Sequence, residues 1–429
     1  PLQAEALSIV TATTPRAPLE ARGSASTAWR RLVAGCALTL AMGACDTAEP
    51  AASEGEFRAG ARDWGSEASL RDVIDKPFSL PDVSSCQVAD DALGITCWYE
   101  KNVERGSFQG KPRSNGRAVD IDYAVFRAER ERAKIVIVTG RTESYLKYAE
   151  FAYDMMERNG DLRYSLYIID HRGQGYSDRL LTAADVPSGS ASHVGDRGFV
   201  DEFDDYVADL DTFVRVEVRP NDCTKTFGLA HSMGGGIMTR YLQQHYQDDA
   251  FDGVILTSPM HGIASLDDAG WGTETASLAL LRGLVTTGQG WRYVPGGQPF
   301  DPNDGFDIDD NTVTHSLDRH RFVNWLFRSE PVVQLGSPTA RWVVKSHDAT
   351  TLMQDANQSP SALDLPILLL QASDEMIVSN NSQAKVCGNL ANCTLEQVSG
   401  ARHEPIFEVD AVRDKYLDRI VAFFEGHLG

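Results

Sequence analysis

Hydrophobic and polar positions follow two different rhythms along the chain from about residue 118. Short runs that are apolar at nearly every position predict strands, and longer segments with an apolar residue every three or four positions predict helices. The predicted strands are 118–128, 133–140, 164–170, 224–232, 251–259 and 365–373, and the predicted helices include 144–160, 199–218 and 416–428. Short, doubly apolar strands that alternate with helices indicate an α/β fold with a mostly parallel sheet covered on both faces. Ligands of such a sheet bind along the edge where the carboxyl ends of the strands meet.

One segment interrupts this alternation. Residues 260–364 separate two predicted strands by far more than an ordinary connection. The segment contains four tryptophan residues, whereas disordered segments are poor in aromatic residues. We therefore predict that residues 260–364 form a cap inserted into an α/β core, which comprises residues 76–259 and 365–429.

The start of the chain has a different composition. Residues 1–28 show no helical or strand period and are predicted to be a non-structured extension. Residues 29–45 combine a basic start, an apolar run and a final Gly-Ala-Cys, which is the pattern of a signal peptide. The apolar run is too short to span a bilayer.

The cysteine at the end of this segment resembles the lipobox of bacterial lipoproteins, in which the cysteine is acylated. Cys36 also fits a lipobox but leaves almost no apolar run before it, so we expect the lipid at Cys45. A plain secretory signal with an accidental cysteine is the alternative. Residues 46–62 are rich in Ala, Glu and Gly, and residues 46–75 are predicted to be a flexible tether. The implied location is the bacterial cell envelope, with the protein held on a membrane and facing the periplasm or the exterior.

The remaining cysteines and the net charge narrow the picture further. Cys86 with Cys97, and Cys387 with Cys393, could each close a small loop in an oxidising compartment. Cys223 would be left over as a buried thiol. No cluster of residues suggests a structural metal, and a formal charge of −21 argues against binding to nucleic acid.

A serine stands between the predicted strand 224–232 and a helix that begins near Met233. Ala230-His231-Ser232-Met233-Gly234 resembles the nucleophile elbow of α/β-hydrolases, with alanine in the place of the first glycine of G-x-S-x-G. In that turn the serine hydroxyl is exposed above the sheet, and the residues two before and two after it must be small. The alternative is a serine that merely caps a helix.

Serine becomes a nucleophile only when a base takes its proton, and in this fold the base follows an acid late in the chain. His403 lies in a loop before the final predicted helix and is the expected base. Glu375 and Asp374 follow the strand 365–373. We prefer Glu375, because Met376-Ile377-Val378 after it fits the usual phase of this fold, and keep Asp374 as the alternative. The acid would orient the imidazole and stabilise its charged form.

The attack on an ester creates an oxyanion, which needs hydrogen-bond donors that are already in place. The backbone N–H of Met233, at the start of the new helix, is one predicted donor. The backbone N–H of Arg141, in the loop after strand 133–140, is the other.

Five ordered blocks resemble the bacterial lysophospholipase L2 branch of the α/β-hydrolases, and the elbow H-S-M-G-G is similar to that of monoacylglycerol lipases. The blocks are TGRTESYLKYAEFAYDM (139–155), IIDHRGQGYSDRLL (168–181), FDDYVADL (203–210), LAHSMGGGIMTRYLQQH (229–245) and ARHEPIFE (401–408). The resemblance covers about residues 118–429 and includes a cap of similar placement. It implies a serine esterase that frees a fatty acid from a single-chain lipid. It implies no metal and no organic cofactor.

Two other functions remain open from the sequence. Related capped hydrolases include aminopeptidases of the proline type, which need an acidic site for the amine of the substrate, and the Asp-rich stretch 301–310 could supply one. A catalytically silent lipid-binding lipoprotein of the cell envelope could also use this fold. We expect the first function, hydrolysis of a lysophospholipid or a monoacylglycerol, with the lipid substrate and the membrane as partners.

Overall fold

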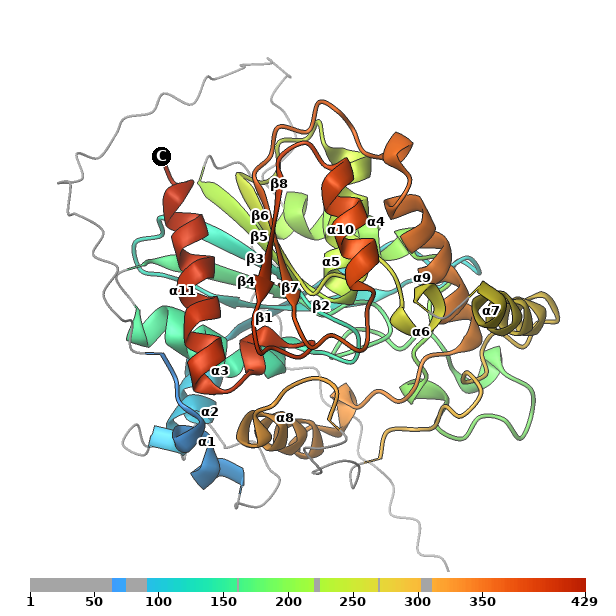
Figure 1. Cartoon of the computed structure of the whole chain (residues 1–429). Coiled ribbons are helices and arrows are strands. Elements are labelled where there is room, and N and C mark those ends of the chain that lie inside the picture. Colours follow the sequence, from blue (N-terminus) through green and yellow to red (C-terminus); the bar gives the residue numbers. More distant parts are fainter. Residues whose placement is uncertain (1–63, 75–90, 160–161, 220–223, 269–270, 302–310) are drawn as a thin grey trace, which may run out of the picture. The chain divides into compact units, whose positions relative to one another are not determined.

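The computed structural model describes residues 64–74, 91–159, 162–219, 224–268, 271–301 and 311–429 (Figure 1). The predicted extension, the signal segment with Cys36 and Cys45, and the cysteines at 86 and 223 lie outside the described residues. Among the residues described, no helix is both long and apolar enough to cross a membrane.

Eight strands form one sheet in the order β1-β2-β4-β3-β5-β6-β7-β8. β3 to β8 run parallel, and β1 and β2 are antiparallel to their neighbours. The strands are β1 Glu104–Gln109, β2 Asp120–Phe126, β3 Ala133–Val138, β4 Tyr164–Ile169, β5 Lys225–His231, β6 Gly253–Thr257, β7 Ile367–Ala372 and β8 Cys393–Val398. Every residue of β3, β4, β6 and β7 is buried, as strands covered on both faces require. The predicted α/β fold with a mostly parallel sheet is confirmed.

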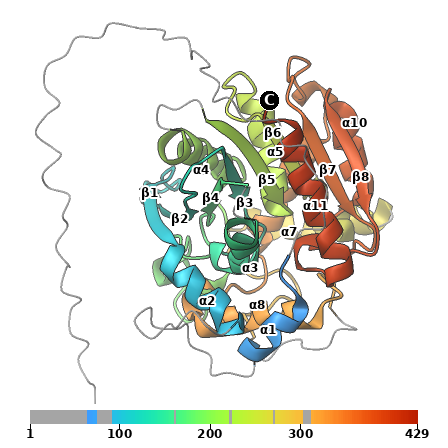
Figure 2. The same ribbon diagram turned by 90° about the vertical axis from the view of Figure 1, so that its left-hand side faces the viewer.

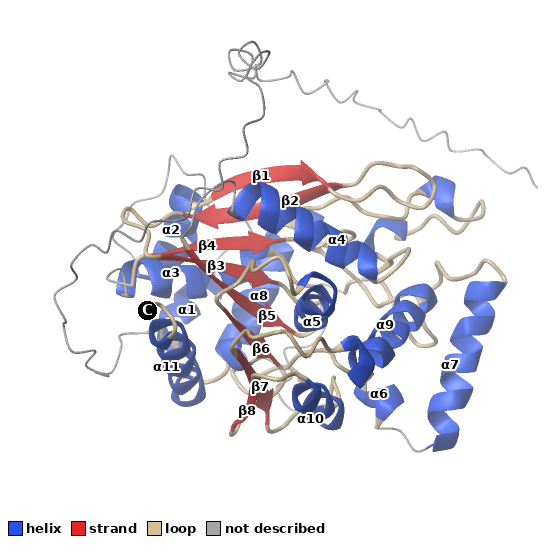
Figure 3. Ribbon diagram, turned by 90° about the horizontal axis from the view of Figure 1, so that it is seen from above, coloured by secondary structure: helices blue, strands red, loops and turns tan. Residues whose placement is uncertain are grey.

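Helices cover both faces of the sheet (Figure 3). α3 and α11 lie on one side, and α4, α5 and α10 lie on the other; Figure 2 shows α3 and α11 in front of the strands. Their bounds are α3 Ala149–Tyr153, α4 Asp204–Phe213, α5 Met233–His245, α10 Asn380–Asn389 and α11 Asp410–Gly426. Each face has its own hydrophobic cluster, so the sheet is the shared wall between two cores.

Two predicted helices are less regular than the sequence pattern suggests. The segment 144–160 contains a 3-10 turn, the short α3 and a π turn over Asp154–Arg158. The segment 199–218 begins as a loop, continues as α4 and ends in a π turn over Val214–Val218. Each π turn adds a residue to the helical period, which a pattern search with a period of 3.6 does not detect.

The predicted tether 46–75 does not extend as far as expected. Its last residues form α1 (Glu67–Ile74), and Trp64 and Leu70 are buried in the same cluster as the α3 face of the sheet. Trp64 and Leu70 follow the residues rich in Ala, Glu and Gly, and the burial of these two large apolar side chains stabilises the attachment. α2 (Asp91–Asn102) follows and contributes Ile95 and Tyr99 to the same cluster.

The described residues of the inserted segment 260–364 form four α-helices, α6 Ala264–Asp267, α7 Trp271–Thr286, α8 Leu317–Ser329 and α9 Ala340–Met353. All four also contribute to the cores, with Leu266 of α6 and Leu281 of α7 in the same cluster as α5. Phe322 and Trp325 of α8 join one cluster, and Trp342 of α9 joins the other. α7 packs on α9 and lies farther from the sheet (Figures 1 and 3).

The cysteines in the described part of the chain form disulfides. Cys387 and Cys393 are joined, with their Cα atoms 5.3 Å apart. This bond ties the end of α10 to the start of β8. Cys97 is also disulfide-bonded, and its predicted partner at position 86 lies outside the described residues.

Candidate active site

Ser232 occupies the turn between β5 and α5. Its backbone has φ 52° and ψ −118°, in the left-handed region that costs a non-glycine residue about 1–3 kcal/mol. Three backbone hydrogen bonds hold the turn: Ser232 N–H donates to Thr257 O at 3.1 Å, and its carbonyl accepts from Met260 N at 2.8 Å and Gly236 N at 3.1 Å. A Cβ at Gly234 would collide with the carbonyl of Val138. The small residue predicted at this position is therefore a steric requirement of the turn.

The structure brings the side chains of Ser232, His403 and Glu375 into one hydrogen-bonded row. His403 Nε2 lies 2.8 Å from Ser232 Oγ. His403 Nδ1 lies 2.8 and 3.0 Å from the two carboxylate oxygens of Glu375. With a proton on Nδ1 donated to Glu375, Nε2 is free to accept the serine proton, as a general base must.

Glu375 is held ionised by its surroundings. One of its oxygens accepts from the backbone N–H groups of Met376, Ile377 and Val378 at 2.8–3.2 Å. Burial raises the pKa of Glu375, but the hydrogen bond from His403 and those from the backbone outweigh it, and the pKa lies below its usual value. A fixed negative charge beside Nδ1 favours the imidazolium that forms during proton transfer.

The alternative acid, Asp374, faces a different histidine. Its carboxylate lies 3.7 Å from His315 Nε2, and its side chain is 51% exposed. Both residues lie in the turn after β7, which ends at Ala372, and their side chains meet different histidines. Between the two carboxylates proposed from the sequence, the structure places only Glu375 against His403.

The predicted oxyanion donors lie beside the serine. Met233 is the first residue of α5, where backbone N–H groups lack an acceptor within the helix. Arg141 follows Gly140 in the loop after β3 and lines the same cavity as Ser232. The two donors come from neighbouring strands, since β3 pairs with β5. Their role in catalysis stays a prediction.

A charged network that the sequence analysis missed supports this loop. Glu143 accepts a hydrogen bond from Gly140 N at 2.5 Å and another from Tyr148 Oη at 2.8 Å. Lys147 Nζ bridges Glu143 at 2.8 Å and Glu404 at 2.6 Å. Burial raises the pKa of Glu143, but Lys147 and His231 lower it to about 2. The network thus joins the oxyanion loop to the residue after His403.

The sequence indicates one ion pair of this network and gives no sign of the other. Glu143 and Lys147 are four residues apart, the spacing at which side chains meet on a helix. Glu404 stands 257 positions after Lys147, and no local pattern links the two. Glu143, His231 and Glu404 present atoms within 4.8 Å of one another, as metal ligands do. The Lys147 ammonium bonds both carboxylates, so we assign this group as a salt-bridge network.

His231, the elbow residue before the serine, packs against the proposed base. Its ring centroid lies 4.9 Å from that of His403, and its Nδ1 lies 3.2 Å from Thr257 O. Burial lowers the pKa of His231, which favours the neutral ring. A neutral ring supports the His403 imidazole without repelling the charge that His403 gains.

The D-H-R-G-Q-G turn (170–175) braces the oxyanion loop from the other side. Gln174 Nε2 donates to Gly140 O at 2.7 Å and to Glu143 O at 3.0 Å. Asp170 accepts from the backbone N–H groups of Tyr145 at 2.6 Å and Tyr176 at 2.8 Å. The turn therefore positions the loop, as its interpretation as a structural element predicts.

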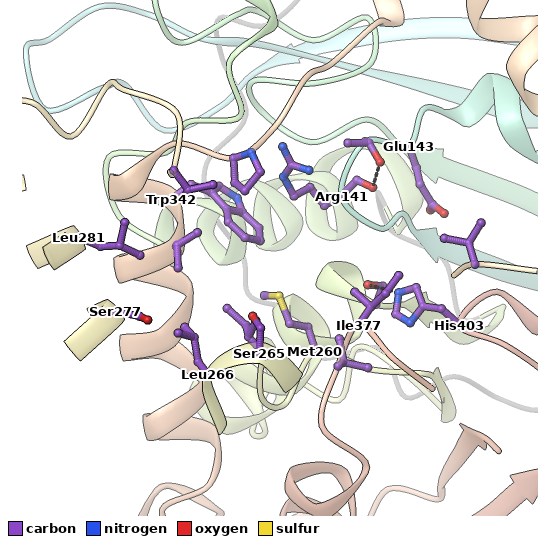
Figure 4. Close-up of a pocket in the computed structure, with 18 of the residues that line it drawn as sticks. Arg141, Glu143, Met260, Ser265, Leu266, Ser277, Leu281, Trp342, Ile377 and His403 are labelled. Carbon is purple, nitrogen blue, oxygen red and sulfur yellow. Dashed lines mark hydrogen bonds between the residues drawn. The ribbon is translucent and has the colours of Figure 1, made fainter. Parts of the chain in front are cut away.

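These side chains open into a cavity of about 640 Å³ (Figure 4), within the range of small-molecule sites. Ser232, His403 and Arg141 line one part of it. Apolar side chains line most of the rest: Met260, Ile263, Leu266, Leu280, Leu281, Val294, Trp342, Val343 and Ile377. Figure 4 shows Leu266, Leu281 and Trp342 on one side and Glu143 and His403 on the other. The cavity can hold an apolar chain next to a polar reacting end.

The sheet, the strained serine turn and the Ser-His-Glu row define a serine hydrolase with the α/β-hydrolase fold. The family model for the serine aminopeptidase family S33 (Hydrolase_4) matches residues 129–410, and the chain belongs to this family. The predicted class of enzyme and the predicted family are confirmed.

Known proteins resemble the chain in sequence and in fold. Lysophospholipase L2 of Escherichia coli K12 is 35% identical over 322 residues, which cover 72% of this chain and 85% of that protein. A probable lysophospholipase L2 of Haemophilus influenzae is 31% identical over 292 residues, or 68% and 83% of the two chains.

Two solved structures share the fold at low sequence identity. A soluble variant of monoglyceride lipase from Saccharomyces cerevisiae has a TM-score of 0.53 and 19% identity, and covers 76% of this chain and 97% of its own. A thermostable carboxyl esterase from Bacillus coagulans has a TM-score of 0.53 and 18% identity, with 76% and 99% covered.

Proposed function

We propose that the enzyme hydrolyses the acyl ester of single-chain lipids, either lysophospholipids or monoacylglycerols, and releases a fatty acid. The observation that carries the proposal is the Ser232-His403-Glu375 row at the polar end of a largely apolar cavity. The relatives of which this chain covers most of the length are named lysophospholipases.

In the proposed reaction, Ser232 Oγ attacks the acyl carbonyl while His403 Nε2 takes the hydroxyl proton. The oxyanion accepts hydrogen bonds from the backbone N–H groups of Met233 and Arg141. Collapse of the tetrahedral intermediate breaks the ester bond, and His403 gives its proton to the leaving glycerol oxygen. A water molecule, deprotonated by His403, then attacks the acyl-enzyme and releases the fatty acid. The apolar wall excludes other water from the site.

An aminopeptidase function is the second candidate, because the family description names a serine aminopeptidase. Such an enzyme needs a carboxylate for the substrate amine. In the cavity wall that the structure describes, Glu143 and Glu404 are both bonded to Lys147. Most of the Asp-rich stretch 301–310 lies outside the described residues. The paired carboxylates favour the esterase.

Fatty-acid release tests the proposal directly. The purified protein should release fatty acid from palmitoyl lysophosphatidylethanolamine and from monopalmitoylglycerol, and Ser232→Ala should not. Proline 4-nitroanilide is the competing substrate. Equal or faster turnover of the amide would replace the esterase by the peptidase. Failure of a fluorophosphonate probe to label the wild-type protein would instead favour the silent lipid-binding function.

We also propose that Cys45 carries a lipid that holds the enzyme at a membrane of the bacterial envelope. The support is the sequence pattern of residues 29–45 alone. A radiolabelled fatty acid fed to cells should be incorporated into the wild-type protein and not into Cys45→Ser. Equal incorporation in Cys45→Ser, with loss in Cys36→Ser, would move the anchor to the earlier cysteine, and no incorporation in any form would leave a plain secretory signal.

A further inference from the structure

The side chain of Arg141 carries a charge that the protein does not neutralise. Its Nη2 donates to Gly336 O at 2.6 Å, and the guanidinium carbon lies 5.2 Å from the centroid of the Trp342 ring. Its Nε is buried and has no hydrogen-bond partner among the described residues. In the described part of the chain, no carboxylate forms an ion pair with Arg141.

Arg141 is half-buried, and three buried arginines in the described residues are each paired with a carboxylate. Arg113 pairs with Asp201 at 2.8 Å, Arg172 with Asp209 at 2.6 Å, and Arg319 with Glu150 at 3.0 Å. A charge taken out of water needs such a partner, because desolvation is expensive. Burial lowers the pKa of Arg141 to about 10, so the guanidinium is still positive at neutral pH. Arg179 and Arg197 also donate to backbone carbonyls, but of these arginines it is Arg141 that lines the cavity beside Ser232.

The position of Arg141 relates this charge to the substrate. The apolar cavity adjoins a second, more polar cavity of about 450 Å³, and the two share Arg141, Thr142, Val313 and Pro338 as lining residues. The second cavity is lined by polar side chains that include Gln298, His320, Asn324 and Ser337, with Asp301 at its exposed rim. An acyl chain in the first cavity leaves the glycerol end of the lipid beside the guanidinium.

We propose that the Arg141 side chain binds the phosphodiester of a lysophospholipid, so that the enzyme prefers lysophospholipids to neutral monoacylglycerols. The inference rests on the proposed function. A guanidinium offers parallel N–H donors that match two phosphate oxygens. The phosphodiester supplies the negative charge that the chain itself does not provide. In this proposal the side chain of Arg141 binds the head group, while the backbone N–H of the same residue donates to the acyl carbonyl oxygen.

The test compares two substrates with the same octanoyl chain, lysophosphatidylethanolamine and monoacylglycerol, at monomeric concentrations. The readout is the ratio of their kcat/KM values, because a shift of the loop that slows both reactions leaves this ratio unchanged. We expect Arg141→Met to lower the ratio about 10- to 100-fold, the range of one charge-assisted contact. Arg141→Lys, which keeps the charge but loses the paired donors, should fall in between. A loss of less than threefold in Arg141→Met, or a rise, overturns the inference.

Arg197→Met is the matched control. Arg197 also lies over aromatic rings, 5.1 Å from Trp291 and 5.3 Å from Tyr293, but it lines neither cavity. Its removal changes the net charge equally and should leave the ratio within twofold.

The wild-type protein provides a test that does not depend on the folding of a variant. Raising the salt from 50 to 500 mM should weaken kcat/KM for the phospholipid more than for the monoacylglycerol. An equal effect on both counts against the inference. If the wild-type protein hydrolyses neither ester, the proposed function itself fails, and that result is distinct from an unchanged ratio.

Discussion

The two walls of the active-site cavity are built on different principles. The sheet-edge wall comes from loops after β3, β5, β7 and β8 and carries Arg141, Glu143, Ser232 and His403, with Glu375 hydrogen-bonded to His403. The opposite wall comes from the inserted segment 260–364 and presents Leu266, Leu280, Leu281, Trp342 and Val343. Directional bonds at 2.5–3.2 Å hold most side chains of the first wall. Apolar contacts hold most side chains of the second wall, and Trp342 also hydrogen-bonds Tyr206, so we expect the first wall to set the rate and the second wall to set the choice of acyl chain.

This difference predicts unequal consequences for substitutions. Removing one hydrogen-bonded group from the sheet-edge wall should abolish or greatly slow the chemical step for every ester. Removing methylene groups from the inserted segment should change the discrimination among esters by modest factors.

Ser232→Ala should reduce kcat for any ester by at least about 10⁴-fold, because it removes the nucleophile and leaves only binding and oxyanion contacts. The measurement is fatty-acid release with a soluble short-chain ester. The variant should unfold in urea at the same midpoint as the wild-type protein or a higher one, since a smaller residue in a strained turn keeps the fold. Residual activity above 1% of the wild-type value would exclude Ser232 as the nucleophile.

Glu375→Gln should lower kcat about 10³- to 10⁴-fold, because an amide cannot stabilise the imidazolium and favours the wrong tautomer of His403. Asp374→Asn is the matched control, one residue away and half exposed, and should change kcat less than twofold. Steady-state kinetics on one ester compare the two directly. The reverse order of effects would transfer the role of the acid to Asp374.

The choice between Glu375 and Asp374 shows how far the sequence alone determines the site, and the same limit applies to the fold. The buried strands were readable because their runs are apolar at every position, and the serine turn because its small residues are adjacent in the chain. β1 was not predicted. Its sequence, Glu104–Gln109, is largely polar and exposed, and it is a strand because its backbone pairs with β2.

The rest of the site depends on contacts between distant segments. Lys147 meets Glu404 only because the loop after β8 folds back over the loop after β3. The Arg141 side chain was unreadable for a different reason. The Arg141 side chain matters because it has no acidic partner among the described residues. This can be recognised only once the positions of the surrounding residues are known. The sequence therefore predicted the reacting groups better than the groups that position them or that select the substrate.

Glu143→Gln should lower kcat about 10- to 100-fold, because the amide weakens the hold on Gly140 and with it the placement of the Arg141 N–H. It should also cost about 3 kcal/mol of stability, as breaking a buried ion pair does. Urea unfolding and short-ester kinetics measure the two effects. An unchanged kcat in a destabilised variant would limit Glu143 to a structural role.

The pH dependence separates the ion pair from other effects of this substitution. The pKa of Glu143 is about 2 in the folded protein, below that of an unfolded glutamate at about 4.3. A depressed pKa stabilises the fold fully above the unfolded value and loses this effect as pH falls toward 2. The stability gap between wild-type protein and Glu143→Gln should therefore be constant from pH 5 to 7 and narrow below pH 4.5. A gap that does not change with pH would show that the charge contributes nothing.

Leu281→Ala should change the preference among acyl chains and leave the rate of the chemical step nearly unchanged. Leu281 is 6% exposed and lines the cavity from α7, so its loss removes contacts from a long acyl chain and none from a butanoyl group. We expect kcat/KM for a palmitoyl ester to fall about 5- to 30-fold, the effect of 1–2 kcal/mol, and that for a butanoyl ester to change less than twofold. Leu352→Ala removes an exposed leucine on α9 outside the cavity and should alter neither value. An equal loss on both esters would mean that the inserted segment shapes the reacting end as well, and the division between the two walls would not hold.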